Sequence, residues 1–294
     1  MMRLVRRIAL WTLGVFAAVV IVLAILAAPI AYRVFHGLDR YEATPPSLPA
    51  ILKQPAILVF SKTNGFRDDP AIDASNAMFR EIGTARGWTM VFSENGAVFN
   101  PAQLALFKAV VWNNASGDVL TPDQRQAFRS YLENGGGFVG VHGAGGDPNY
   151  RWRWYVDELI GAQFIGHTMW PHRQRAFVHV EDPTGPIMAG LPRIWVREDE
   201  WYSFDRSVQA KGYHVLATVD ERTYVPHGLL NENIRMGRDH PIIWSHCVGR
   251  GRAFFSALGH FPATYSAEPL HRQMLADAVA WAAGLTGDDC KAAD

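Results

Sequence analysis

Residues 121–147 read TPDQRQAFRSYLENGGGFVGVHGAGGD, and the prediction of the fold begins here. Thr121 and Gln124 match the capping box that opens many helices. Three glycines at 135–137 end this helix, and an apolar strand over 138–141 follows directly. The strand then enters a turn of small residues. A helix, a buried strand and a turn in this order are typical of an α/β domain.

The same alternation extends on both sides of this stretch. Apolar runs of strand type lie at 56–60, 88–92, 109–112, 241–244 and 251–258, and helical spacing lies at about 70–86 and 268–283. Strands that alternate with helices predict a mainly parallel sheet covered on both faces. Residues 150–235 are rich in aromatic side chains and show no clear partition into elements. Since no repeat or second linker is visible, we expect one domain over 55–284.

An uncharged run over 8–32 is the clearest feature of the N-terminal part. A bilayer core needs about 20 apolar residues, so this run predicts one transmembrane helix. The basic segment 1–7 favours a cytoplasmic N-terminus and a domain outside, which in a bacterium means the inner membrane and the periplasm. A cleaved signal peptide is the competing interpretation, although its apolar core is usually only about 7–15 residues long.

Prolines between 45 and 49 indicate an extended linker over 33–54, and 285–294 is a polar tail. Lys and Arg together number 28, as do Asp and Glu, so the net charge is zero and nucleic-acid binding is not expected. Cys247 lies in an apolar, strand-like run and Cys290 in the tail. We therefore expect one buried and one exposed thiol rather than a bridge.

Polar residues follow two of the predicted strands, where ligands collect in open parallel sheets. Arg67 and Asp69 follow the first strand and could bind a polar ligand, although a solvated loop with an aspartate helix cap explains them equally well. His142 and Asp147 lie in the turn after 138–141. A lone histidine is more often structural than catalytic. The small residues around His142 favour a site, because they let a ligand approach the backbone.

Further polar residues recur downstream, namely His167, His172, Glu200, Tyr202 and His260. Histidines with a carboxylate could bind a metal, but none has the close spacing of a strong metal motif. The sequence therefore predicts no metal site, and it leaves the cofactor unknown. Several tryptophans could stack on sugar faces or lie in the core: Trp152, Trp154, Trp170, Trp195, Trp201 and Trp244.

Five motifs in order resemble the ThuA-like family, which is named for trehalose utilisation. They are ILVFSKTNGFR at 57–67, GGGFVGVH at 135–142, GAQFIGH at 161–167, DEWY at 199–202 and GRGRAFFSALGH at 249–260. The resemblance covers about residues 55–284. It implies a flavodoxin-like fold of the class I glutamine-amidotransferase type and a link to carbohydrate metabolism.

The resemblance also sets expectations about the chemistry. Amidotransferases carry a nucleophilic cysteine at the turn that here begins with His142, and neither cysteine of this chain lies there. Glutamine hydrolysis is therefore not expected. Members of the family commonly read Phe-Arg-His where this chain has Asp68, and Gly-His-Pro where it has Thr168. The first difference removes an imidazole from the expected site and favours a binding role.

We therefore expect a sugar or keto-sugar derivative to bind in a crevice at the strand ends. His142, Glu200 and His260 are the predicted catalytic residues, which would exchange protons near a carbonyl group. The predicted substrate-binding residues are Arg67, Asp69, Asp147, His167 and Tyr202. The alternatives are a non-catalytic ligand-binding or interaction module at the membrane and a metal-dependent hydrolase. The oligomeric state does not follow from the sequence.

Overall fold

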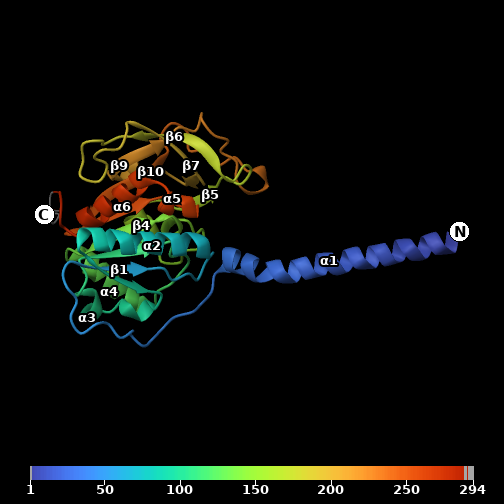
Figure 1. Cartoon of the computed structure of the whole chain (residues 1–294), viewed down its shortest axis with the longest axis horizontal. Helices are drawn as coiled ribbons and strands as arrows, with labels where there is room; N and C mark the ends of the chain where they lie inside the picture. The colour runs from blue at the N-terminus through green and yellow to red at the C-terminus, as the bar shows by residue number, and fades with distance from the viewer. Residues whose placement is uncertain (1, 288–289, 291–294) are drawn as a thin grey trace.

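A computed structural model describes residues 2–287 and 290 of the chain. Its α-helices are α1 (Met2–His36), α2 (Asp69–Arg86), α3 (Pro101–Leu104), α4 (Pro122–Glu133), α5 (Pro262–Ser266) and α6 (Pro269–Ala282). Its strands are β1 (Ala56–Phe60), β2 (Thr89–Ser93), β3 (Ala109–Asn113), β4 (Gly137–Val141), β5 (Phe164–His167), β6 (Gln174–Val180), β7 (Ile194–Asp199), β8 (Tyr202–Phe204), β9 (His214–Val219), β10 (Pro241–Val248) and β11 (Gly251–Ser256). Short helical turns are η1 (Gly96–Val98), η2 (His142–Gly145), η3 (Tyr155–Ile160), η4 (Val208–Lys211) and η5 (Leu229–Asn231). Figure 1 shows α1 projecting from the body that the other elements form.

In the described part of the chain, a nine-stranded sheet has the order β2-β1-β3-β4-β11-β10-β9-β6-β7. The strands from β2 to β11 pair in parallel, and those from β11 to β7 pair antiparallel. The predicted α/β fold with a largely parallel central sheet is therefore confirmed. The antiparallel strands β6, β7 and β9 come from the region that the sequence left unassigned. Strands β5 and β8 form a separate two-stranded antiparallel sheet.

Side-chain caps explain where the first helices of the domain begin. The hydroxyl of Thr121 accepts a hydrogen bond from the backbone of Gln124, whose side chain accepts one from the backbone of Thr121. The capping box predicted for α4 is therefore confirmed. At α2, the carboxylate of Asp68 accepts a hydrogen bond from the backbone of Ala71. Asp68 thus has the role of the helix cap considered for this loop.

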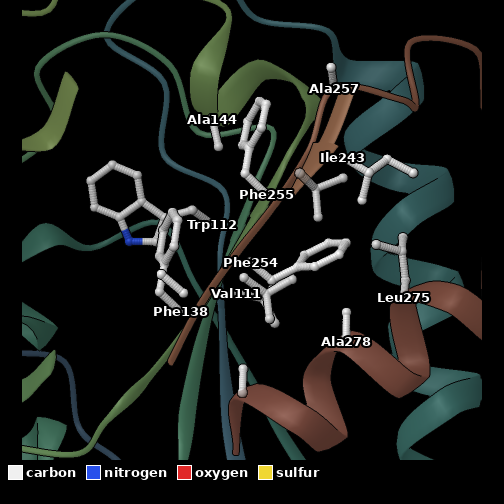
Figure 2. Close-up of a cluster of buried hydrophobic side chains, with 14 of the residues drawn as sticks. Val111, Trp112, Phe138, Ala144, Ile243, Phe254, Phe255, Ala257, Leu275 and Ala278 are labelled. Atoms are coloured by element: carbon white, nitrogen blue, oxygen red, sulfur yellow. The ribbon is translucent and has the colours of Figure 1, made fainter. Parts of the chain in front are cut away.

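The core lies on both faces of the parallel strands, and β1, β3 and β4 are buried throughout. Figure 2 shows Trp112 and Phe138 on one side of these strands and Leu275 and Ala278 of α6 on the other. Burying a side chain of the size of Phe138 or Leu275 stabilises the fold by about 1.5–3 kcal/mol. The two packed layers hold the strands in place and so give the carboxyl-end loops a rigid base.

Helix α1 is one continuous helix with no buried residue, and it is long and apolar enough to cross a membrane. Beyond it, the backbone of Leu38 donates a hydrogen bond to the carbonyl of Asn64 at 2.7 Å. Lys62 Nζ lies 2.5 Å from Glu42 Oε2, and Gln103 Nε2 donates to the carbonyl of Pro46 at 2.7 Å. The segment 37–54 is therefore attached to the domain at several points along its length.

The expectation of two unbridged thiols is wrong. Cys247 and Cys290 form a disulfide, with their Cα atoms 5.7 Å apart. Their exposure is also the reverse of the prediction, since Cys247 is exposed on β10 and Cys290 is buried. Cys247 lies near the end of β10, beyond the buried part of the strand, whereas the chain after α6 brings Cys290 back to it. The other residues of the predicted polar tail from 288 onward lie outside the described residues.

Candidate functional site

One buried carboxylate surrounded by four imidazoles forms the candidate site. We call it the His–Glu cluster, and its members are Glu200, His142, His167, His172 and His260. Glu200 Oε1 lies 2.5 Å from His167 Nδ1. Glu200 Oε2 lies 2.7 Å from His260 Nδ1, 3.4 Å from His172 Nε2 and 3.6 Å from His142 Nε2. The side chains of Glu200 and His142 are 3% and 4% exposed, against 30% and 39% for His167 and His172, so the cluster has a buried floor and one accessible side.

His142 follows β4 directly and is fixed from two directions. Its φ of 46° lies in the left-handed region, which residues other than glycine seldom adopt. Its Nδ1 donates a hydrogen bond to the carbonyl of Ala257 at 2.8 Å, so in the neutral ring Nε2 is the nitrogen that carries the lone pair. The hydroxyl of Tyr202 donates to that Nε2 at 3.0 Å. The imidazole therefore has one orientation and one tautomer, with Nε2 able to accept a proton or to bind a metal.

Asp199, the last residue of β7, joins the backbone segments that carry Glu200 and His260. Its carboxylate accepts hydrogen bonds from the backbone of Gly259 at 3.0 Å and of His260 at 3.2 Å. It also accepts one from the backbone of Glu200 at 2.9 Å. Asp199 is fully buried, and these bonds compensate for its loss of solvent. The end of β7 and the loop after β11 are thereby held together.

Thr168 ties the loop between His167 and His172 to the segment beside Glu200. Its backbone donates a hydrogen bond to the carbonyl of Trp201 at 3.1 Å, and its hydroxyl accepts one from the backbone of Trp201 at 3.2 Å. The same hydroxyl donates to the carbonyl of His172 at 3.0 Å. A proline at this position would lack both the backbone donor and the hydroxyl. The difference from the family pattern at this residue therefore has a structural role here.

The charges of the cluster reinforce one another. Burial alone would raise the pKa of Glu200, but the close approach of the four imidazoles outweighs it and lowers that pKa well below its usual value. Burial lowers the pKa values of His167 and His260, yet the neighbouring carboxylate raises both overall. Burial and the charge of Glu200 raise the pKa of Tyr202 well above its usual value, so its hydroxyl remains a donor. The cluster thus combines an ionised carboxylate with two imidazoles, those of His167 and His260, that hold a proton more strongly than usual.

Two groups within the cluster have the composition of a metal site. They are His142, Glu200 and His260, and His167, His172 and Glu200, each with its ligand atoms within 4.8 Å of one another. Zinc bonds of about 2.0–2.2 Å place neighbouring tetrahedral ligand atoms roughly 3.3 Å apart. His142 Nε2 and His260 Nδ1 are 3.4 Å apart, which matches that spacing. Within residues 2–287 and 290, the buried atoms Glu200 Oε2 and His172 Nε2 have no hydrogen-bond partner of suitable geometry.

Of the predicted site residues, His142, His167, Glu200, Tyr202 and His260 converge. Arg67 and Asp69 do not join them, because Arg67 pairs with Asp69 at 2.6 Å and with Glu94 at 2.9 Å. Asp147 also lies elsewhere and accepts a hydrogen bond from the backbone of Asn149 at 2.7 Å. Burial raises the pKa of Asp147 to about 6. These three residues lie in loops at the same edge of the sheet but belong to separate contacts.

The predicted site residues did not include two residues that the structure places here, the cluster member His172 and its neighbour Asp68. His172 lies five residues after His167, and its recurrence in one short stretch was the available signal. Asp68 Oδ2 lies 3.5 Å from His260 Nδ1. Asp68 therefore places a carboxylate beside the cluster at the position where the family pattern has an imidazole. Four imidazoles remain around Glu200 in spite of that difference.

The small residues after His142 pack against the protein itself. A methyl group at Gly145 would meet the ring of Phe255, and one at Gly146 would meet the ring and hydroxyl of Tyr202. We expected these residues to let a ligand approach the backbone, and at these two positions they instead let aromatic rings approach it. Because Gly146 has no side chain, the Tyr202 ring packs against its backbone, and this packing positions the Tyr202 hydroxyl beside His142.

Comparisons with known proteins agree with this fold. The chain resembles the crystal structure of a ThuA-like protein from Bacteroides uniformis with a TM-score of 0.66 and 24% identity, over 81% of this chain and 95% of that one. A ThuA-like protein from Parabacteroides merdae gives 0.55 and 18%, over 78% and 89%. A protein from Salmonella typhimurium described as cytoplasmic gives 0.52 and 12%, over 77% and 99%. No curated protein matches the chain.

The sequence itself matches a family profile over residues 56–282, which includes the whole nine-stranded sheet and every member of the His–Glu cluster. That profile is described as ThuA, trehalose utilisation. The chain belongs to the ThuA family.

Proposed function

We propose that this chain is a membrane-anchored ThuA domain that binds a sugar or keto-sugar derivative at the His–Glu cluster and acts on it by acid–base chemistry. The observation that carries the proposal is the convergence of four imidazoles on the single buried carboxylate of Glu200. A non-catalytic binding module has no need of such a group of titratable side chains. The family description, trehalose utilisation, supports a carbohydrate as the ligand.

The proposed chemistry is isomerisation or elimination next to a carbonyl group. With Nδ1 bonded to the carbonyl of Ala257, Nε2 is the basic nitrogen of a neutral His142, and in place of the hydrogen bond from Tyr202 it would accept the proton that leaves the carbon atom beside the carbonyl. The raised pKa of His260 favours its protonated form, which would donate a proton to the carbonyl oxygen. The two nitrogens lie 3.4 Å apart. Glu200 stabilises the imidazolium, and a base and an acid therefore stand side by side.

The test is a screen of glycosides and 3-keto-glycosides for changes in mass or isomer. For a substrate that the screen identifies, H142A and E200Q should each lower the turnover rate by about 10²–10⁴-fold. E198Q and H214A are the matched controls, because they change exposed titratable side chains outside the cluster and should keep the rate. Full activity in both cluster variants would refute the assignment.

Three observations support the proposed anchor and a location outside the cytoplasm. Helix α1 has the length and composition of a membrane span, and Arg3, Arg6 and Arg7 precede its apolar part. The Cys247–Cys290 bridge is typical of an oxidising compartment such as the periplasm. Because these cysteines are bridged, neither is a free thiolate for glutamine hydrolysis. Mass spectrometry of the mature N-terminus tests the anchor, and a start near Tyr32 would contradict it.

A metal-dependent hydrolase is the second candidate, and the geometry around Glu200 Oε2 favours it. Three imidazole nitrogens lie within 3.6 Å of that oxygen, and within the described residues it has no hydrogen-bond partner of suitable angle. Nitrogen and carboxylate ligands of this kind suit zinc and similar divalent ions. A bound ion would polarise a carbonyl group or activate water. His142, His260 and Glu200 would hold it.

Metal content and binding heat separate the two candidates. If the second is right, the purified protein should contain about one equivalent of a transition metal, lose it to a chelator and rebind it in calorimetry. The variant E200Q should bind it at least about 10-fold more weakly, while H214A should bind it as the parent does. Chelator-resistant turnover by protein free of metal would refute the hydrolase.

A further inference from the structure

The end of α1 touches a loop that also reaches the His–Glu cluster. The guanidinium of Arg33 donates hydrogen bonds to the carbonyl and the hydroxyl of Thr63, both at 3.1 Å, in the loop after β1. Five residues later in the same loop, Asp68 Oδ2 lies 3.5 Å from His260 Nδ1. This short loop therefore connects the base of the proposed anchor to the cluster.

A second loop makes the same connection. It begins with His142, inside the cluster, and continues to Asn149. The side chain of Asn149 donates a hydrogen bond to the carbonyl of Val34, in the last turn of α1, at 2.8 Å. Two independent loops thus place the end of α1 at the edge of the sheet where the cluster lies.

The position of these contacts along α1 gives their depth at a membrane. The predicted span ends at residue 32, and α1 ends at His36. At about 1.5 Å per residue, these four residues cover roughly 6 Å. A headgroup layer is about 5–7 Å thick on each side of the hydrocarbon core. If α1 spans the bilayer, the loops that contact Arg33 and Val34 lie at the level of the headgroups.

Exposed apolar side chains surround this edge. Phe66 in the loop after β1 is 49% exposed, Trp170 in the loop after β5 is 74% exposed, and Leu230 between β9 and β10 is 92% exposed. The backbone of Met169 donates a hydrogen bond to the carbonyl of His227 at 3.0 Å, so the last two loops are adjacent. Figure 1 shows β5 and the orange segment between β9 and β10 on the side of the domain from which α1 emerges.

We propose that this edge of the domain lies against the bilayer that holds α1, with Phe66, Trp170 and Leu230 among the lipid headgroups. Aromatic and leucine side chains are favourable at that depth. The inference rests on the proposed anchor. The accessible side of the His–Glu cluster then opens close to the membrane surface.

Spin labels on the full chain in nanodiscs of phosphatidylethanolamine and phosphatidylglycerol test this arrangement. The labels are placed by L230C and by the control L106C, an exposed leucine before β3 at the opposite edge of the parallel strands. Collisions with oxygen, which concentrates in lipid, are compared with collisions with a water-soluble nickel complex. The ratio of oxygen collisions to nickel collisions should be several-fold higher for the label at 230 than for the label at 106.

Equal ratios at 230 and 106 would overturn the proposal. Alkaline carbonate extraction of the same membranes separates this failure from a failure of the anchor. Protein that stays in the membrane with a water-exposed label at 230 refutes only the docking of the domain edge. Protein that is released refutes the anchor and the docking together. Because Leu230 is almost fully exposed, the label there leaves the core unchanged.

Discussion

Reduction of the Cys247–Cys290 disulfide should lower the stability of the domain strongly. The two cysteines are 43 residues apart in the sequence, and the chain between them contains β11, α5 and α6. Opening a loop of this length returns conformational entropy to the unfolded chain worth about 4 kcal/mol at 25 °C. For a domain of this size, that loss corresponds to a fall in melting temperature of roughly 8–16 °C.

The assay is urea unfolding of the full chain in detergent, followed by tryptophan fluorescence with and without dithiothreitol. The oxidised protein should unfold at the higher urea concentration. The double variant C247S/C290S should match the reduced protein and should not respond to dithiothreitol. Alkylation and mass spectrometry confirm the redox state. A change in unfolding free energy below about 1 kcal/mol, or alkylation of both cysteines without reductant, would refute the reasoning.

Three further predictions concern the His–Glu cluster and its support. The substitution E200Q removes the carboxylate that raises the pKa values of His167 and His260, so both should titrate at lower pH in NMR spectra, and unchanged values would contradict the assigned contacts. The stability that Glu200 gives the fold should be largest between pH 4.5 and 6.5. It is lost as pH falls through the lowered pKa of Glu200 or rises through the raised pKa values of the histidines, and the difference in unfolding free energy between parent and E200Q across roughly pH 3 to 9 measures it. The substitution G146A places a methyl group against Tyr202, so it should cost about 1–3 kcal/mol in thermal unfolding, and a neutral effect would show that the turn can shift.

The parallel half of the sheet was predictable because its signals are local. Each of its strands is a short apolar run, and Thr121 and Gln124 form the capping box that their spacing indicates. Strands β6, β7 and β9 were not predictable in this way. In β6 and β7, buried residues alternate with exposed ones, and long loops separate β6, β7 and β9, so no continuous apolar run marks them.

The sequence indicated which residues form the candidate site better than it indicated which of them contact one another. His142 and His260 follow the neighbouring strands β4 and β11, but Glu200 follows β7 at the far edge of the sheet. Its approach to them depends on tertiary contacts such as those of Asp199 with the backbone of Gly259 and His260, which no local pattern indicates. Arginine commonly binds anionic ligands, but here the carboxylates of Asp69 and Glu94 neutralise the charge of Arg67. The prediction of two unbridged cysteines was wrong for a related reason. The chain returns to β10 after α6, and no local sequence pattern near Cys290 indicates that return.

The attachment of residues 37–54 to the domain also bears on the order of events during synthesis. Asp39 pairs with Arg151, and the side chain of Gln124 donates a hydrogen bond to the carbonyl of Glu42, so both partners are made long after the segment itself. In the proposed topology, α1 enters the bilayer while these partners are still untranslated. The segment therefore cannot complete these contacts until Arg151 has been made, after α1 has entered the bilayer.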